Sequence, residues 1–326
     1  MCNNMHVNAK IKHIIEKIRI SVKKEANKKP IVISGSPRTG STWFMEILSY
    51  FERTYSIFEP LHPSWFEDAD NLDIGFRPYI DPDQENPDFK QFLNYIFEGG
   101  RISNNPHFDY SQIYSRFKGD VPVIKFVRAN RALQWIAKKM ELNSCFLLIR
   151  HPCATISSQL KTGYTGYIDD SYSKNIIPSK SDIIKDIREI DIIPNEKIDI
   201  VKNAKNKIEI LSIIYSLDYY IPLYYLDKYK INLVTYEDLL LNPKETIKDI
   251  SAITGLDYDK RKILKNVVKP SQMTEQEKIN RKHQLSKWRN NLKERQINSI
   301  FNIVRSFDVK IYGDSLTPNT HGFDTV

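Results

Sequence analysis

The feature that most constrains this sequence is a nine-residue stretch near its start, SGSPRTGST (34–42). The β-branched run IVIS (31–34) leads into it, and STWFMEILSYF (41–51), which has apolar residues at helical spacing, follows it. A strand, a glycine-containing turn and a helix in this order direct backbone N–H groups and the positive end of the helix dipole to one point. The sequence therefore predicts an anion-binding loop between a strand and a helix.

The loop differs from the nucleoside-triphosphate-binding pattern G-x-x-x-x-G-K-S/T at one position. Gly35 and Gly40 have the spacing of that pattern, but Ser41 stands where its lysine would be. Arg38, two residues before the second glycine, keeps a cation beside the anion and moves it along the loop. We therefore expect an anion geometry different from that of an ATP-binding loop.

Further strands and helices alternate along the chain, and this alternation indicates the fold class. Short buried-type strands separated by helices favour right-handed crossovers and a parallel sheet, with ligands at the carboxyl ends of the strands. We predict a three-layer α/β/α fold with a central parallel sheet and a P-loop-like anion-binding loop. The other expected strands are 121–127, 145–150 and 231–236, and the expected helices are 41–51, 129–140, 153–160 and 243–253.

The sequence indicates one domain, residues 30–312, with additions. Residues 64–118 and 161–205 are polar and lack clear periodicity, so we interpret them as insertions that shape a substrate pocket, the alternative being surface insertions without a role. Residues 1–29 form a basic amphipathic helix in this interpretation, which either packs on its own domain, as we favour, or makes peripheral contact with an anionic membrane. Residues 313–326 are a C-terminal tail.

Composition argues against several classes of protein. A hydrophobic content of 41% with 27% charged residues is typical of a soluble globular protein, and no run has the length of a membrane-spanning helix. Cys2, Cys145 and Cys153 form no C-x-x-C pair and no zinc spacing, which indicates a reducing compartment and no structural metal. We therefore expect a cytoplasmic protein. The formal charge of +8 is spread along the chain and does not by itself identify a partner.

Two motifs together resemble those of the sulfotransferases that use 3′-phosphoadenosine 5′-phosphosulfate (PAPS) as sulfuryl donor. PRTGSTW (37–43) resembles their 5′-phosphosulfate loop, and Arg150 and Ser158 in LLIRHPCATISSQL (147–160) resemble their 3′-phosphate site. A guanidinium offers phosphate a planar fork of donors, and a serine hydroxyl adds a neutral donor. The resemblance implies PAPS as donor co-substrate, no metal, and these donor-binding residues: Ser36, Pro37, Arg38, Thr39, Gly40, Ser41, Thr42, Trp43, Arg150 and Ser158.

Weaker elements of the same family follow in its order. SIFEPLHP (56–63) resembles the F-E-P segment of carbohydrate sulfotransferases, and VIKFVR (123–128) is similar to their lysine-bearing strand. Arg281 and Lys282 lie where many members add basic residues at the 3′-phosphate, although the glycine that follows them in small-molecule enzymes is missing and the run is otherwise a solvated basic segment. VTYEDLLLNP (234–243) and KWRNNL (287–292) resemble later elements.

The chemistry of sulfuryl transfer assigns roles to these residues. Like phosphoryl transfer, it is an in-line displacement in which catalysis is mostly positioning and charge stabilisation. We expect Arg38 to face the sulfuryl group. The resemblance to carbohydrate sulfotransferases implies Glu59, in the F-E-P segment, as the base with His62 in reserve, and Val127 stands where small-molecule sulfotransferases have their histidine. Lys125 either contacts the sulfuryl group or an anionic acceptor, or is solvated. The alternative for Glu59 is helix capping or ion pairing.

Other classes of function fit less well. A P-loop kinase or ATPase needs the missing lysine and a strand that ends in a magnesium-binding aspartate. A nucleic-acid-binding protein would explain the charge, but no such module is recognisable and we expect none. A family member that binds nucleotide without catalysis stays open. The resemblance favours a hydroxyl-bearing acceptor, a saccharide or glycolipid, and the oligomeric state is not predicted.

Overall fold

The structure is a computed structural model of the chain, and it describes residues 28–63, 66–72, 74–99, 118–165, 167–168, 175–267 and 281–319. The helix predicted over residues 1–29 lies outside this range, apart from its last two residues. The end of the tail predicted over residues 313–326 lies outside it as well, from residue 320 onwards.

The centre of the fold is a five-stranded sheet in which every neighbouring pair of strands is parallel. The predicted strands are present, and one strand that the sequence analysis did not identify, β2, forms an edge. The order β2-β3-β1-β4-β7 places the first strand in the middle. The strands are β1 (Ile31–Ser34), β2 (Thr54–Phe58), β3 (Val121–Phe126), β4 (Ser144–Ile149) and β7 (Ile231–Thr235).

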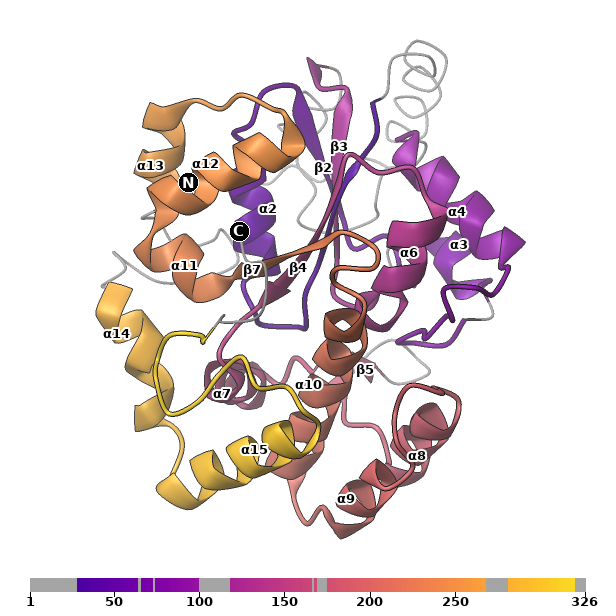
Figure 1. The fold of residues 1–326 in the computed structure, drawn as a ribbon, viewed down its shortest axis with the longest axis vertical. Coiled ribbons are helices and arrows are strands. Elements are labelled where there is room, and N and C mark those ends of the chain that lie inside the picture. The colour runs from indigo at the N-terminus through magenta and orange to yellow at the C-terminus, as the bar shows by residue number, and fades with distance from the viewer. Residues whose placement is uncertain are drawn as a thin grey trace.

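Helices cover both faces of the sheet, which confirms the predicted three-layer α/β/α fold (Figure 1). Side chains alternate across β1, so that Ile31 and Ile33 face one apolar cluster and Val32 faces the other. The first cluster lies under α2 (Ser41–Leu48), α11 (Tyr236–Leu241), α12 (Pro243–Thr254), α13 (Lys260–Val267) and α14 (Arg281–Ser286). The second includes α4 (Pro87–Phe97), the 3₁₀ turn η1 (Asn130–Ala132), α6 (Leu133–Lys139) and the helices of the next paragraph.

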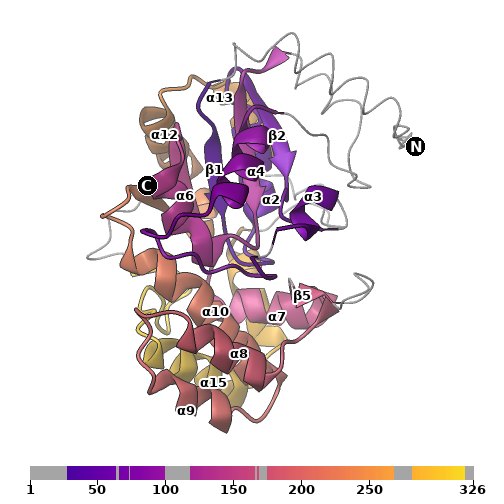
Figure 2. The same cartoon turned by 90° about the vertical axis from the view of Figure 1, so that its right-hand side faces the viewer.

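A group of helices lies against the carboxyl ends of the strands, below the sheet in Figures 1 and 2. Its central member, α10 (Lys207–Tyr224), is bonded to the end of β4 at two points: the Tyr219 hydroxyl donates to the carbonyl of Leu148 at 2.9 Å and the Tyr215 hydroxyl donates to the carbonyl of Arg150 at 2.8 Å. The other members are α7 (Pro152–Thr162), α8 (Lys180–Arg188), α9 (Lys197–Asn203), the 3₁₀ turn η2 (Lys287–Asn290) and α15 (Glu294–Ser306).

The two predicted insertions meet each other near this end of the sheet. Phe76, from the first, stacks on Tyr167 of the second with ring centroids 5.7 Å apart, and Arg77 donates to the carbonyl of Thr165 at 2.9 Å. Their regular elements are α3 (Glu67–Asp70) and α4 in the first, and the antiparallel pair β5 (Tyr167–Ile168) and β6 (Asn175–Ile176) with α8 and α9 in the second. Among the described residues, no helix combines the length and apolar composition needed to cross a membrane.

Candidate active site

The strand order places the anion-binding loop where ligands bind in open parallel sheets. From β1 the chain continues to one side, to β2, whereas from β4 it continues to the other side, to β7. The carboxyl ends of β1 and β4 therefore flank the point at which the strand order reverses, which is the usual ligand-binding crevice of such sheets. Residues 35–40 follow β1 at this point, and Arg150 follows β4.

The loop has a backbone that favours anion binding. Arg38 and Gly40 both adopt positive φ angles, 71° and 98°, and α2 begins immediately afterwards with no side chain capping its N-terminus. The first helical bond of α2 runs from the Phe44 N–H to the Gly40 carbonyl at 2.9 Å, so the first three N–H groups of α2, those of residues 41–43, have no partner within the helix and face a ligand or water. The predicted strand, loop and helix are therefore present in sequence order.

Both glycines of the loop are required by close neighbours. A Cβ atom at Gly35 would lie 2.9 Å from the carbonyl oxygen of Leu148, and one at Gly40 would lie 2.6 Å from the ring of Tyr236. The glycine spacing seen in the sequence thus reflects packing of the loop against β4 and the start of α11.

The loop is held from outside by polar contacts with α7 and α10. The hydroxyl of Ser36 donates to Asp218 at 2.5 Å, its N–H donates to the Tyr219 hydroxyl at 3.1 Å, and the Pro37 carbonyl accepts from Gln159 at 2.9 Å. Within the loop, the Thr39 hydroxyl donates to the Ser36 carbonyl at 2.7 Å. These contacts fix the loop before any ligand arrives.

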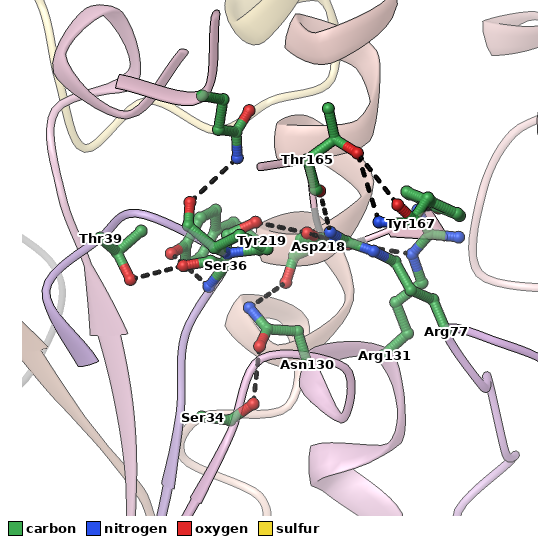
Figure 3. A network of polar contacts seen from close by, with 12 residues as sticks. Ser34, Ser36, Thr39, Arg77, Asn130, Arg131, Thr165, Tyr167, Asp218 and Tyr219 are labelled. Carbon is green, nitrogen blue, oxygen red and sulfur yellow. Dashed lines mark hydrogen bonds and ion pairs between the residues drawn. The ribbon is translucent and has the colours of Figure 1, made fainter. Parts of the chain in front are cut away.

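Asp218 is the centre of this network (Figure 3). Besides Ser36, its buried carboxylate accepts from Arg77 of the first insertion and from Arg131 of η1, the latter at 3.2 Å. Arg131 also contacts Asp186 of α8 at 2.7 Å. This carboxylate therefore joins the loop after β1 to the first insertion directly, and to the second insertion through Arg77 and Arg131.

Arg38, Arg150 and Ser158 lie close together in the structure. Arg38 Nε donates to the hydroxyl of Ser158 at 3.1 Å, and Arg150 Nη1 donates to the Arg38 carbonyl at 3.2 Å. Burial and the nearby charge of Arg150 lower the pKa of Arg38. Neither arginine forms an ion pair with a carboxylate of the described residues, and Arg150 Nε has no hydrogen-bond partner there. Two guanidiniums without counter-ions fit a strongly anionic ligand.

Arg150 is positioned by residues of the Y-E-D-L segment. Its guanidinium carbon lies 4.1 Å from the centroid of the Tyr236 ring. The next residue, His151, donates its N–H to Glu237 at 3.1 Å, and burial raises the pKa of Glu237 to about 7. The His151 ring stacks on Trp288 with centroids 4.7 Å apart, so this tryptophan of the K-W-R segment supports the turn after β4.

The other candidate catalytic residues lie at the ends of β2 and β3. Glu59 is fully buried and has a positive φ of 49°. One of its carboxylate oxygens lies 2.5 Å from Lys125 Nζ, and the other accepts from the N–H of Val127 at 2.9 Å. Burial lowers the pKa of Lys125, and the charge of Glu59 opposes this shift. Glu59 therefore forms an ion pair, which was the alternative to its role as base, and the role as base stays a prediction.

His62 and Tyr164 lie near the same charges. Burial lowers the pKa of His62 to about 3, and Arg128 and Lys125 add to this, so the imidazole is neutral and weakly basic. Burial raises the pKa of Tyr164 to about 12; the charge of Glu59 also raises it, whereas those of Arg128, Arg77 and Arg38 lower it. The hydroxyl of Tyr164 thus lies within electrostatic reach of both the loop after β1 and the ends of β2 and β3.

The remaining predicted residues divide into two groups. Ser41, Thr42 and Trp43 open α2; Trp43 packs against Tyr236 with centroids 5.2 Å apart and belongs to the core. Arg281 begins α14, but the side chains of Arg281 and Lys282 lie outside the described part of the structure. Their contact with a nucleotide stays a prediction. The part of the chain that the structure describes contains no group of three or more His, Cys, Asp or Glu residues placed to hold a metal ion.

The comparisons with known proteins found few matches. No protein-family model matches the sequence, and no curated protein does. Two similar solved structures are a domain from the curacin biosynthetic pathway and one from the Synechococcus PCC 7002 olefin synthase. Both are sulfotransferase domains.

The likeness to these two structures is long but distant. The curacin domain is 13% identical over 86% of this chain and 98% of its own, with a TM-score of 0.44. The olefin synthase domain is 15% identical over 90% of this chain and 98% of its own, also with a TM-score of 0.44. At this similarity the comparison carries no argument about the site.

Proposed function

We propose that this protein is a sulfotransferase that moves a sulfuryl group from PAPS to a hydroxyl of an acceptor. The observation that supports this most is the convergence of Arg38, Arg150 and Ser158 at the crevice between β1 and β4, with no carboxylate of the described residues paired to either arginine. The ligand that these groups favour carries phosphate-like charge at two places, beside the loop and beside the end of β4.

In this proposal each group has one task. The N–H groups at the start of α2 and the side chain of Arg38 hold the 5′-phosphosulfate, and Arg150 with Ser158 holds the 3′-phosphate. The acceptor oxygen forms a bond to sulfur while the bond from sulfur to the phosphate oxygen breaks, and the bisphosphate leaves with the electron pair of that bond. Fixed cations neutralise the charge of the leaving phosphate.

The acceptor proton requires a base, and Glu59 is the candidate. Its two contacts, with Lys125 and with the Val127 N–H, occupy two of the roughly four lone-pair positions of a carboxylate, which leaves acceptor capacity for a hydroxyl proton. A left-handed backbone at a residue other than glycine is a form of strain that concentrates at functional sites. A saccharide or glycolipid acceptor is the finer part of the proposal and rests on the F-E-P resemblance, whereas the proposed cytoplasmic location rests on the composition and cysteine pattern of the sequence.

The first experiment measures the thermal stability of the purified protein with three ligands: adenosine 3′,5′-bisphosphate, AMP, and ATP with Mg²⁺. A ligand at 100 times its Kd stabilises the folded state by about 2.7 kcal/mol. We expect this effect from the bisphosphate alone, and we expect Arg150→Ala to lose it. Arg305→Ala, an exposed arginine on α15, is the matched control and keeps it.

Two outcomes would redirect the proposal. Stabilisation by ATP with Mg²⁺ and not by the bisphosphate would favour a kinase or ATPase and refute the sulfotransferase assignment. Selective binding of the bisphosphate, followed by no transfer of label from ³⁵S-PAPS to any acceptor in a panel of hydroxyl compounds, would indicate a nucleotide-binding protein without this activity.

A further inference from the structure

Arg128 is a buried guanidinium without a counter-ion among the residues that the structure describes. It follows the last residue of β3 by two positions and is 2% exposed. None of its three nitrogens, Nε, Nη1 and Nη2, has a hydrogen-bond partner. Its guanidinium carbon lies 4.3 Å from the centroid of the Phe76 ring. A guanidinium stays charged and has five N–H donors, so this arrangement is costly until an anion from outside the chain completes it.

Arg131, three residues further on, shows how the same fold treats a buried arginine that is structural. It is 1% exposed, and its nitrogens contact Asp218, Asp186 and the Tyr167 hydroxyl. The two side chains therefore share their burial and differ in their partners. Arg128 has the features of a ligand-binding residue, and Arg131 has those of a structural one.

The strand order places Arg128 on the opposite side of the loop from Arg150. Strands β3 and β4 flank β1, and Arg128 follows the first as Arg150 follows the second. The Arg150 side includes Ser158, whereas the Arg128 side includes Lys125 and Glu59. An anion at Arg128 is thus next to the proposed base and away from the proposed 3′-phosphate.

The surroundings of Arg128 belong to the segments that we interpret as the acceptor side. Phe76, on which the guanidinium lies, comes from the first insertion and stacks on Tyr167 of the second. The charges that act on Arg128 include those of Tyr164, Glu59 and Arg77, with burial as the largest effect on its pKa. No hydrogen bond among the described residues joins Arg128 to the loop after β1. The expected anion therefore approaches with the acceptor.

We propose that Arg128 binds an anionic group, a carboxylate or a phosphate, that the acceptor carries near the hydroxyl to be sulfated. The acceptor is accordingly an acidic molecule and not a neutral sugar or lipid. That the anion belongs to the acceptor rests on the proposed function, but the anion site itself follows from Arg128 alone.

A first test measures the unpaired charge without any ligand. Arg128→Met keeps much of the side-chain volume and removes the charge, so we expect the melting temperature of the free protein to rise by about 2–4 °C. Arg131→Met is the matched control and is expected to lower it by at least as much, because it removes the partner of Asp186 and one of the two arginines that pair with buried Asp218. A fall in melting temperature for Arg128→Met comparable to that of the control would show that Arg128 is structural and would overturn the inference.

A second test measures anion binding by calorimetry on the protein saturated with adenosine 3′,5′-bisphosphate. Glucuronate and glucose 6-phosphate are each compared with glucose, which lacks the charge. We expect at least one acid to bind at least tenfold more tightly than glucose, and we expect Arg128→Met to abolish the difference while the Kd of the bisphosphate changes less than twofold. The preferred acid distinguishes carboxylate from phosphate.

The outcomes separate this inference from the proposed function. If neither acid binds more tightly than glucose, or if Arg128→Met weakens the bisphosphate as much as the acid, the inference is wrong; the second result would assign Arg128 to the donor. If the bisphosphate does not bind and an acid still requires Arg128, the anion site stands and the proposed donor fails.

Discussion

Replacing Asp218 by asparagine tests whether one carboxylate holds the site together. The side chain is fully buried, and Arg77 and Arg131 are nearly so. After neutralisation, Arg131 keeps Asp186, whereas among the described residues Arg77 keeps no carboxylate and is left with the carbonyl of Thr165 and the face of the Tyr167 ring. Removing one partner of a buried ion pair costs about 3–5 kcal/mol. Because asparagine still offers an oxygen to Ser36, we expect the loss to come from the two arginines.

The measurement is urea unfolding with linear extrapolation of the free energy of unfolding, on variants with an unchanged m value. Asp186→Asn is the matched control and should cost less, since Asp186 is 37% exposed and Arg131 keeps Asp218 as a partner when Asp186 is neutralised. In the double variant Arg77→Met with Asp218→Asn, the loss should be smaller than the sum of the two single losses. A cost below about 1 kcal/mol for Asp218→Asn, or strict additivity, would refute this reasoning.

Three further predictions follow from single residues. Gly40→Ala should lower the free energy of unfolding more than Gly163→Ala. Both glycines have a positive φ, which costs an alanine about 1–2 kcal/mol, but only the Cβ at position 40 would meet a neighbour, the Tyr236 ring. Equal losses in urea unfolding would contradict this. The raised pKa of Glu237, about 7 against about 4.5 unfolded, means that the folded state holds the proton more tightly, so stability falls by about 3 kcal/mol as pH rises through this window. Glu237→Gln should remove this fall when the free energy of unfolding is measured from pH 4 to 8. An unchanged dependence on pH in the variant would rule out Glu237 as its source. Glu59→Gln should lower turnover about 10²–10⁴-fold with unchanged bisphosphate affinity, and normal turnover would exclude it as the base.

The sequence predicted the parts of the fold that depend on local pattern. The loop after β1 has its own signature in two glycines and a β-branched strand, and each glycine proved to have a close neighbour. By contrast, β2 was missed, because TYSIF is short, carries a serine in its centre and directly follows helix α2 and a turn. Helix α10 was missed because it is buried almost all round and therefore lacks amphipathic spacing.

The parts of the site that could not be predicted depend on contacts between distant segments. Asp218 lies inside an apolar helix and bonds to Ser36, which is 182 residues away in the sequence. Nothing near it in the sequence marks this role. Arg128 was visible only as the last letter of a strand motif, since the absence of a partner is a property of the packed molecule. Tyr236 was visible only as part of the Y-E-D-L resemblance, which did not indicate that its ring lies under Arg150.

The strand order separates the residues that we propose to bind the donor from the residue that we propose as the base. Neighbouring strands lie about 4.8 Å apart, so β4 and β2, three spacings apart, are separated by about 14 Å along the carboxyl edge. Arg150 and Glu59, which follow these two strands, are too far apart to contact the same phosphate. The loop after β1 and the end of β3 lie between them. In the proposed function, a donor held at Arg150 and Arg38 extends towards Lys125 and Arg128, and an acceptor that reaches Glu59 comes close to Arg128, which is buried and has no counter-ion among the described residues.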